Sequence, residues 1–228
     1  MINTKKYGEI FNLLKDKTGY YWLNYTNHKF VKKLSKGSLN KSLYINYLIQ
    51  DYIFLINFSR AWALLIVKSN SMSEMRIAAD TVNNLINKEI QLHIETCLSE
   101  GISEEKLFSS EEELNNLAYT RYVLEAGYSG DFLDLLVTLS PCIFGYGEIG
   151  KKLINETKID NPYNDWIKVY SGNDYQNLCI NIGKMLDKAI YDRLGKNFKK
   201  HSKWSTLENK FLMATKLEIN FWEMSIKQ

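Results

Sequence analysis

Two carboxylates interrupt helical stripes that are otherwise almost entirely apolar. Positions spaced alternately by four and three residues over 44–65 are apolar or aromatic except for Asp51, and Glu218 interrupts a similar stripe over 207–225. A charge on a buried stripe costs several kcal/mol unless it is paired, hydrogen-bonded or facing a polar cavity. We therefore expect an internal pocket, in which a carboxyl held among apolar groups could act as a general acid. For Glu218 the alternative is a buried pair with a Lys or Arg of another helix.

Cys142 is the candidate nucleophile of the chain. The stripe over 132–153 puts it four residues before Tyr146, so both side chains share the inward face of a helix. Pro141 removes a backbone hydrogen bond and is expected to kink that helix beside a cavity. A nucleophilic Cys142 would need stabilisation of its thiolate by dipoles, a hydroxyl or a proton acceptor. The alternative is an inert core cysteine, which is the interpretation we keep for Cys97 and Cys179.

Glu89 and His93 form a second pair at helical spacing, on one predicted face with Val82, Ile86 and Thr96. A carboxylate and an imidazole four residues apart could bind a metal ion. The chain has only 3 histidines, and no matching second pair is present. We therefore favour a structural hydrogen-bonding pair that holds other site residues in place without contacting the substrate, and we expect no metal.

The elements that must position these side chains are predicted to be helices. Only 2 prolines occur in 228 residues, and no strand-like alternation is found. Helix signals begin at about Tyr7, His28, Asn40 or Ser42, Ser71, Ser110, Asp131, Asn161-Pro162, Asn173 and Ser205. The first helix is expected to reach about Asn24, Gly37 to end the second, and Gly101 to end the one from Ser71. The sequence predicts one all-α multi-helix bundle over residues 1–228.

Composition excludes several classes of function. A net charge of +3 is too small to indicate nucleic-acid binding, and the basic stretch 199–203 is expected to be a solvated loop. The apolar run 52–67 is interrupted by Asn57 and Arg60, so no membrane span is predicted. The 3 cysteines show no close pairing and the N-terminus lacks a signal-peptide pattern, which favours the cytoplasm. No phosphate-binding loop is found, and we expect no cofactor.

Several segments occur together in an order typical of one family. They are 50–55, which includes Asp51 and Phe54; Glu89 with His93; 119–122, which begins at Tyr119; 140–150, which includes Cys142 and Tyr146; 166–170, which ends at Tyr170; and 218–222, which includes Glu218 and Phe221. Over residues 28–225 the chain resembles the TenA family, the thiaminase II or aminopyrimidine aminohydrolase enzymes. Because Cys142 is present, it resembles the cysteine-bearing branch of that family.

The resemblance implies a haem-oxygenase-like all-α fold and a homotetramer. It also implies hydrolysis of 4-amino-5-aminomethyl-2-methylpyrimidine to the 5-hydroxymethyl compound and ammonia, and it leaves open the cleavage of thiamin to the same pyrimidine and a thiazole. The expected partner is therefore a small pyrimidine.

The resemblance also implies a role for each candidate residue. Cys142 would add to the pyrimidine ring, Glu218 would donate and relay protons, and Asp51 would accept hydrogen bonds from the aminopyrimidine edge. The pocket would be lined by Tyr119, Tyr146 and Tyr170, and Phe221 would pack on the ring. Phe54 stands where family members often have Tyr, which puts substrate preference in question.

Two other functions remain open from the sequence. One is a metal-dependent oxidase or oxygenase on the same helical scaffold, which would use Asp51, Glu89, His93 and Glu218. The other is a protein that binds a pyrimidine or thiamin without turning it over. Metal analysis would separate the first alternative from the hydrolase, and ligand binding without product would identify the second.

Overall fold

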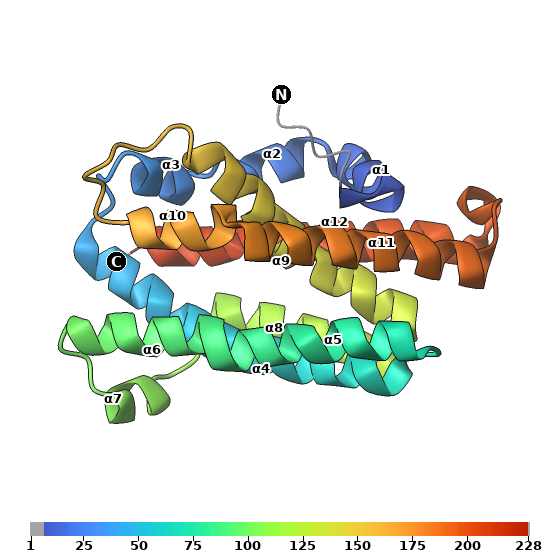
Figure 1. Ribbon diagram of the computed structural model, residues 1–228, viewed down its shortest axis with the longest axis horizontal. Coiled ribbons are helices and arrows are strands. Elements are labelled where there is room, and N and C mark those ends of the chain that lie inside the picture. The colour runs from blue at the N-terminus through green and yellow to red at the C-terminus, as the bar shows by residue number, and fades with distance from the viewer. Residues whose placement is uncertain (1–6, 228) are drawn as a thin grey trace. The chain divides into compact units, whose positions relative to one another are not determined.

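The computed structural model describes residues 7–227, and within them the chain forms helices joined by turns and short loops, with no strand (Figure 1). The predicted all-α class is confirmed. The chain divides into two compact units: unit 1 comprises Met1–Leu39 and Leu136–Trp222, and unit 2 comprises Asn40–Leu135 and Glu223–Gln228. Each unit is described by itself, and the expectation of one domain over residues 1–228 stays a prediction.

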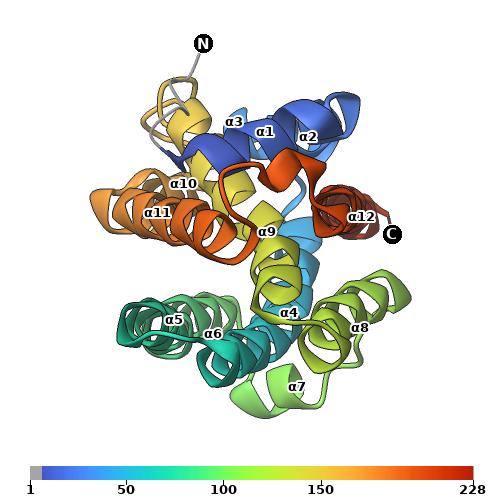
Figure 2. The ribbon, with the colours of Figure 1, turned by 90° about the vertical axis from the view of Figure 1, so that its right-hand side faces the viewer.

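Unit 2 is built around one long helix, α4. Its helices are α4 (Lys41–Lys68), α5 (Met72–Asn84), the π-helix η2 (Leu85–Glu89), α6 (Ile90–Ser99), α7 (Glu104–Phe108) and α8 (Leu114–Ser129). The chain runs along α4 and returns along the continuous rod of α5, η2 and α6 (Figure 1). Figure 2 shows α4 between that rod and α8. This central position explains why polar residues of α4 are buried.

Local capping signals predicted the starts of α4 and α5 correctly. Asn40 Oδ1 accepts a hydrogen bond from the Ser42 N–H at 2.9 Å, and Ser71 Oγ accepts one from the Glu74 N–H at 3.2 Å. The predicted start at Ser110 is wrong, because α8 begins at Leu114. The sequence analysis also missed α7, whose N-cap is Ser103.

Unit 1 is built around α9. Its helices are α1 (Glu9–Thr18), α2 (Tyr20–Thr26), α3 (Lys29–Ser35), α9 (Phe132–Leu153), α10 (Asn164–Ser171), α11 (Asn173–Leu194), the short 3-10 helix η3 (Phe198–Lys200) and α12 (Ser202–Ile226), with the first residues of α9 and the last of α12 assigned to unit 2. Phe144 of α9 contacts Phe11 of α1, with ring centroids 4.3 Å apart. From α11, Cys179 Sγ donates to the Ile143 carbonyl at 3.4 Å. Figure 2 shows α9 in the middle of this unit.

Two predicted elements of unit 1 differ from the structure for physical reasons. The helix expected over 7–24 is divided into α1 and α2 because Gly19 adopts a left-handed conformation with φ 53°. The Asn161-Pro162 pair does not begin α10, which starts at Asn164. Instead, Asn161 Nδ2 donates to the carbonyls of Leu34 and Ser35 at the end of α3, at 2.9 and 2.8 Å. The Asn161 side chain also keeps a local bond, since its Oδ1 accepts from the Tyr163 N–H at 2.9 Å, so it holds the turn before α10 while it binds α3.

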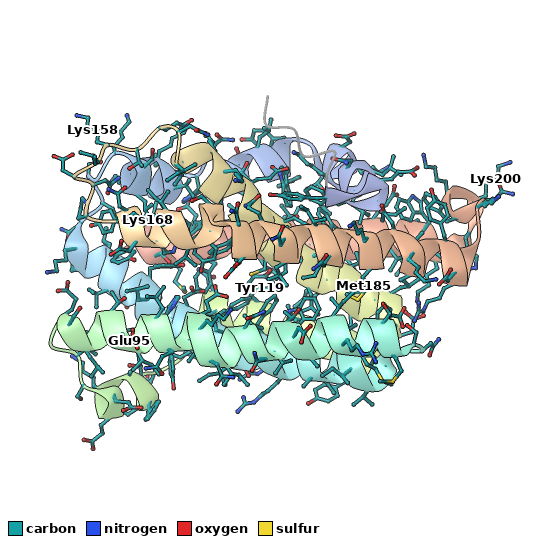
Figure 3. The ribbon with its side chains drawn as sticks, viewed as in Figure 1. Glu95, Tyr119, Lys158, Lys168, Met185 and Lys200 are labelled. Atoms are coloured by element: carbon teal, nitrogen blue, oxygen red, sulfur yellow. The ribbon has the colours of Figure 1, made fainter. Side chains whose placement is uncertain are left out.

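The core helix α9 is unusually apolar. Residues 132–150 are all buried, and Pro141 lies inside a helix that continues on both sides of it. By length and composition alone, α9 could span a membrane. An 18-residue stretch of this helix has a mean hydropathy of 1.3, and that stretch is 100% buried in the structure. The basic stretch 199–203 was expected to be a solvated loop, but it covers the end of η3 and the start of α12; residues 199–202 are exposed, and Lys200 points outward (Figure 3).

Candidate active site

Asp51 is buried in unit 2 and bonded to two polar side chains. Its exposed fraction is 2%. Tyr47, one turn earlier on α4, donates its hydroxyl hydrogen to Asp51 Oδ2 at 2.9 Å, and His93 Nε2 of α6 lies 2.8 Å from the same oxygen. Among residues 7–227, these are the hydrogen-bonding partners of Asp51, so Oδ1 keeps its capacity to accept. The predicted charge in an apolar stripe is thus compensated by side chains that leave one oxygen available.

His93 is the buried imidazole partner of Asp51. Its Nδ1 lies 2.8 Å from the backbone carbonyl of Glu89, and the side chain is 2% exposed. Burial lowers the pKa of His93, but the hydrogen bond and charge of Asp51, together with the charge and carbonyl of Glu89, outweigh burial and hold that pKa above its ordinary value.

A π-turn positions His93. It also changes which face of the rod formed by α5, η2 and α6 is buried. The Ile90 N–H bonds the Leu85 carbonyl, five residues back, which inserts one extra residue into the helix. The buried positions are Ala78, Thr81, Leu85, Ile90, His93 and Cys97. The face predicted through Ile86 is wrong, since Ile86 is 50% exposed. His93 bonds the backbone of Glu89, whose side chain is half-buried.

Phe54 and Tyr119 add an aromatic wall in unit 2. Phe54 lies three residues after Asp51 on α4, and its ring centroid is 4.8 Å from that of Tyr119 on α8, which Figure 3 labels. The start of α8 is tied to α4 by Gln50, whose Oε1 accepts from the Glu113 N–H at 3.0 Å and whose Nε2 donates to the Glu111 carbonyl at 2.9 Å. This pairing fixes where Tyr119 lies and explains why Ser110 does not begin the helix.

Cys142 and Glu218 both lie in unit 1 on its long helices. Cys142 of α9 is buried with a free thiol, and Glu218 of α12 is 2% exposed. Their burial agrees with the stripes on which the sequence placed them. Cys97 belongs to a different environment: burial and the charge of Glu100 raise the pKa of its thiol to about 11, so it stays protonated at neutral pH.

The remaining predicted residues of unit 1 form an aromatic cluster. The Tyr146 ring centroid lies 4.8 Å from that of Tyr170 on α10 and 5.5 Å from that of Trp222 on α12. Phe221 is buried beside Trp222, with their centroids 6.2 Å apart. Gly150 makes the approach of α10 possible, because a Cβ there would lie 2.4 Å from the Tyr170 carbonyl carbon. Trp222 was named in the sequence only as part of a segment, and its role in this cluster was missed.

Tyr47 is the main functional candidate that the sequence analysis overlooked. It lies four residues before Asp51 on one helix, a spacing at which two side chains can bond. That spacing was the available signal.

Among residues 7–227, no group of three or more His, Cys, Asp and Glu side chains is arranged to hold a metal ion.

The fold and these buried groups agree with the comparisons to known proteins. The chain belongs to the TENA/THI-4/PQQC family, whose sequence model matches residues 16–228. It is 34% identical over 217 residues to a Halalkalibacterium halodurans protein named aminopyrimidine aminohydrolase, with 94% of each chain covered. A Helicobacter pylori protein of the same name is 27% identical over 210 residues, covering 90% of this chain and 92% of that protein.

A solved structure shows the same fold at higher identity. The crystal structure of a TenA family transcription regulator from Silicibacter sp. TM1040 superposes with a TM-score of 0.96 and 50% identity, covering 99% of this chain and 100% of that chain. The predicted family resemblance is confirmed.

Proposed function

We propose that this protein is an aminopyrimidine aminohydrolase that converts 4-amino-5-aminomethyl-2-methylpyrimidine to the 5-hydroxymethyl compound and ammonia in thiamin salvage. The observation that carries the proposal is the setting of Asp51, a buried carboxylate with one oxygen left to accept. Phe54 and Tyr119 supply flat aromatic faces in the same unit. An accepting carboxylate with aromatic faces suits a planar aminopyrimidine, whose amino group donates and whose ring stacks.

Asp51 is proposed to bind the aminopyrimidine edge. The amino group of the substrate donates to Oδ1, while Tyr47 and His93 hold Oδ2. A hydrogen bond to an ionised acceptor in a buried setting is worth about 1.5–3 kcal/mol. Asp51 therefore selects a ring that carries a donor at this edge and disfavours one that carries an acceptor.

Cys142 and Glu218 are proposed to perform the reaction. The Cys142 thiolate forms a C–S bond to the pyrimidine ring, and the displaced electron pair expels the amine from the exocyclic methylene as the C–N bond breaks. Glu218 donates a proton to the leaving nitrogen, which departs as ammonia. Water then adds to the methylene and loses a proton to Glu218, and the C–S bond breaks to restore the aromatic ring. The family resemblance supports these roles, and Tyr146, Tyr170 and Phe221 are proposed to line the pocket.

The deciding experiment is product formation by the purified protein from the aminomethylpyrimidine and, in parallel, from thiamin. Ammonia and hydroxymethylpyrimidine released in equal amounts support the proposal, and the two rates rank the substrates. Calorimetric binding without product would favour the non-catalytic binding protein. Stoichiometric iron in the purified protein, with no hydrolysis, would favour the oxidase.

The assembly and location of the protein are also proposals. We infer a cytoplasmic homotetramer, supported by the family resemblance, and one domain over residues 1–228. Sedimentation velocity measures the assembly, and a single calorimetric unfolding transition would support one domain. Dissociation to monomers at micromolar concentration would contradict the tetramer.

A further inference from the structure

The three histidines of the chain present their ring nitrogens to different kinds of partner. His28 Nδ1 accepts from the Phe30 N–H at 3.2 Å, and His201 Nδ1 accepts from the Lys203 N–H at 3.1 Å. Each of these two rings therefore uses Nδ1 to accept from a backbone N–H. His93 has no such donor: Nδ1 lies against the Glu89 carbonyl and Nε2 against Asp51 Oδ2.

The oxygen partners of His93 determine where the protons lie. A carbonyl oxygen only accepts, so Nδ1 must carry hydrogen. Asp51 Oδ2 lies 2.8 Å from Nε2 and also accepts the hydroxyl hydrogen of Tyr47. The groups that act on His93 are Asp51 from α4 and Glu89 from η2, and both add negative charge and an accepting oxygen, while Tyr47 donates to Asp51.

We propose that His93 is a protonated positioning residue, which donates from both ring nitrogens and fixes the Asp51 carboxylate so that Oδ1 faces the aminopyrimidine. The π-turn is part of this device, because it brings the Glu89 carbonyl within 2.8 Å of Nδ1. Burial of the pair keeps water from competing for either bond. The positioning role depends on the proposed function, whereas the charge state of His93 does not.

Nitrogen-15 NMR of the full-length protein, labelled at histidine, tests the charge state without any substrate. Both His93 nitrogens are expected at imidazolium positions at about pH 7, above the ordinary histidine pKa of about 6.5. The ring signals of His28 and His201 serve as internal references. A neutral pattern for His93 at about pH 7 would overturn the proposal.

Binding of the hydroxymethylpyrimidine product by calorimetry tests the positioning role without requiring turnover. His93→Gln keeps an amide donor but no charge, and its Kd is expected to rise about tenfold to a hundredfold. With substrate, kcat/KM should fall more than kcat. His201→Gln is the matched control and should bind as the wild type does. An unchanged Kd in folded His93→Gln would overturn the positioning role.

A second variant covers the case in which His93→Gln does not fold. Tyr47→Phe removes the other donor to Asp51 Oδ2 and keeps the imidazolium. Its Kd is expected to rise about threefold to tenfold, as for the loss of one hydrogen bond. Unchanged product binding in this variant would then overturn the positioning role. Failure of the wild type to bind or hydrolyse the pyrimidine would overturn the proposed function, while the NMR result would still decide the charge state.

Discussion

The surroundings of Asp51 in unit 2 and of Tyr146 in unit 1 bury functional side chains by opposite means. Asp51 is stabilised by charge and hydrogen bonds from Tyr47 and His93, at 2.9 and 2.8 Å. Tyr146 is held by aromatic rings, with Tyr170 and Trp222 at 4.8 and 5.5 Å between centroids. The first arrangement has few members, each of which matters, because a buried charge left alone is costly. The second spreads its stabilisation over many contacts.

This difference separates the parts of the chain expected to select the substrate from those expected to hold reacting groups. A directed carboxylate distinguishes donors from acceptors, whereas an aromatic cluster provides shape and excludes water. Single substitutions in each region test this difference. The properties measured are turnover and the free energy of unfolding.

The largest effect is expected from Cys142→Ser, which should lower turnover of the aminomethylpyrimidine by at least about a thousandfold. A serine hydroxyl is a poor nucleophile without a base to activate it. Circular dichroism and thermal unfolding check that the variant stays folded. Cys97→Ser is the control and should retain turnover, because the Cys97 thiol has a pKa of about 11 and is not the proposed nucleophile. Wild-type rates in Cys142→Ser would refute the proposed nucleophile.

Asp51→Asn is expected to reduce the free energy of unfolding by about 3 kcal/mol at neutral pH. The change removes the negative partner of His93 and leaves a cation buried, or forces it to lose its proton. Urea unfolding gives the value. Asp165→Asn is the matched control, because Asp165 pairs with Lys168 at 3.1 Å on the surface and should contribute less than about 1 kcal/mol. Equal losses in the two variants would mean that the buried pair contributes no more than the surface pair.

Gly150→Ala is expected to destabilise the aromatic region by about 1–3 kcal/mol. Its Cβ would lie 2.4 Å from the Tyr170 carbonyl carbon. Because that carbon is a backbone atom of α10, a helix must move. That cost should exceed the gain of about 1 kcal/mol that alanine gives over glycine in a helix. At Gly127, the control, a Cβ meets a Leu64 methyl at 3.1 Å, which can shift. A more stable Gly150→Ala would contradict the close approach of α9 and α10.

Much of the fold could be predicted from local signals, and the errors arose where a distant residue competed for a local one. The caps at Asn40 and Ser71 use only neighbouring atoms, and they were predicted correctly. Asn161 Oδ1 does accept from the Tyr163 N–H, but the helix begins only at Asn164, and the Asn161 Nδ2 donates to carbonyls more than a hundred residues earlier, which local sequence does not reveal. Ser110 failed because Gln50 fixes the segment before α8.

The candidate site shows the same limit. Asp51, Cys142 and Glu218 could be found because each interrupts an apolar period, and the structure buries all three. The face of the rod that carries His93 was wrong, because a π-turn shifts the period by one residue and leaves no simple mark in the sequence. For that reason the contact of His93 with Asp51, within the network of Tyr47, Asp51 and His93, could not be predicted.

The smallest and most specific effect is a pH dependence of stability that belongs to unit 2 alone. Because the folded pKa of His93 lies above its ordinary value, the native state binds more protons than the unfolded chain between the two pKa values. The stabilisation from His93 is therefore complete below about pH 6.5, the unfolded value, and is lost as the pH rises through the folded pKa. The difference in unfolding free energy between wild type and His93→Gln should shrink from acidic to alkaline pH. Subtracting the curve of His201→Gln removes general effects, and a difference that grows with pH would reverse the sign and exclude a buried imidazolium.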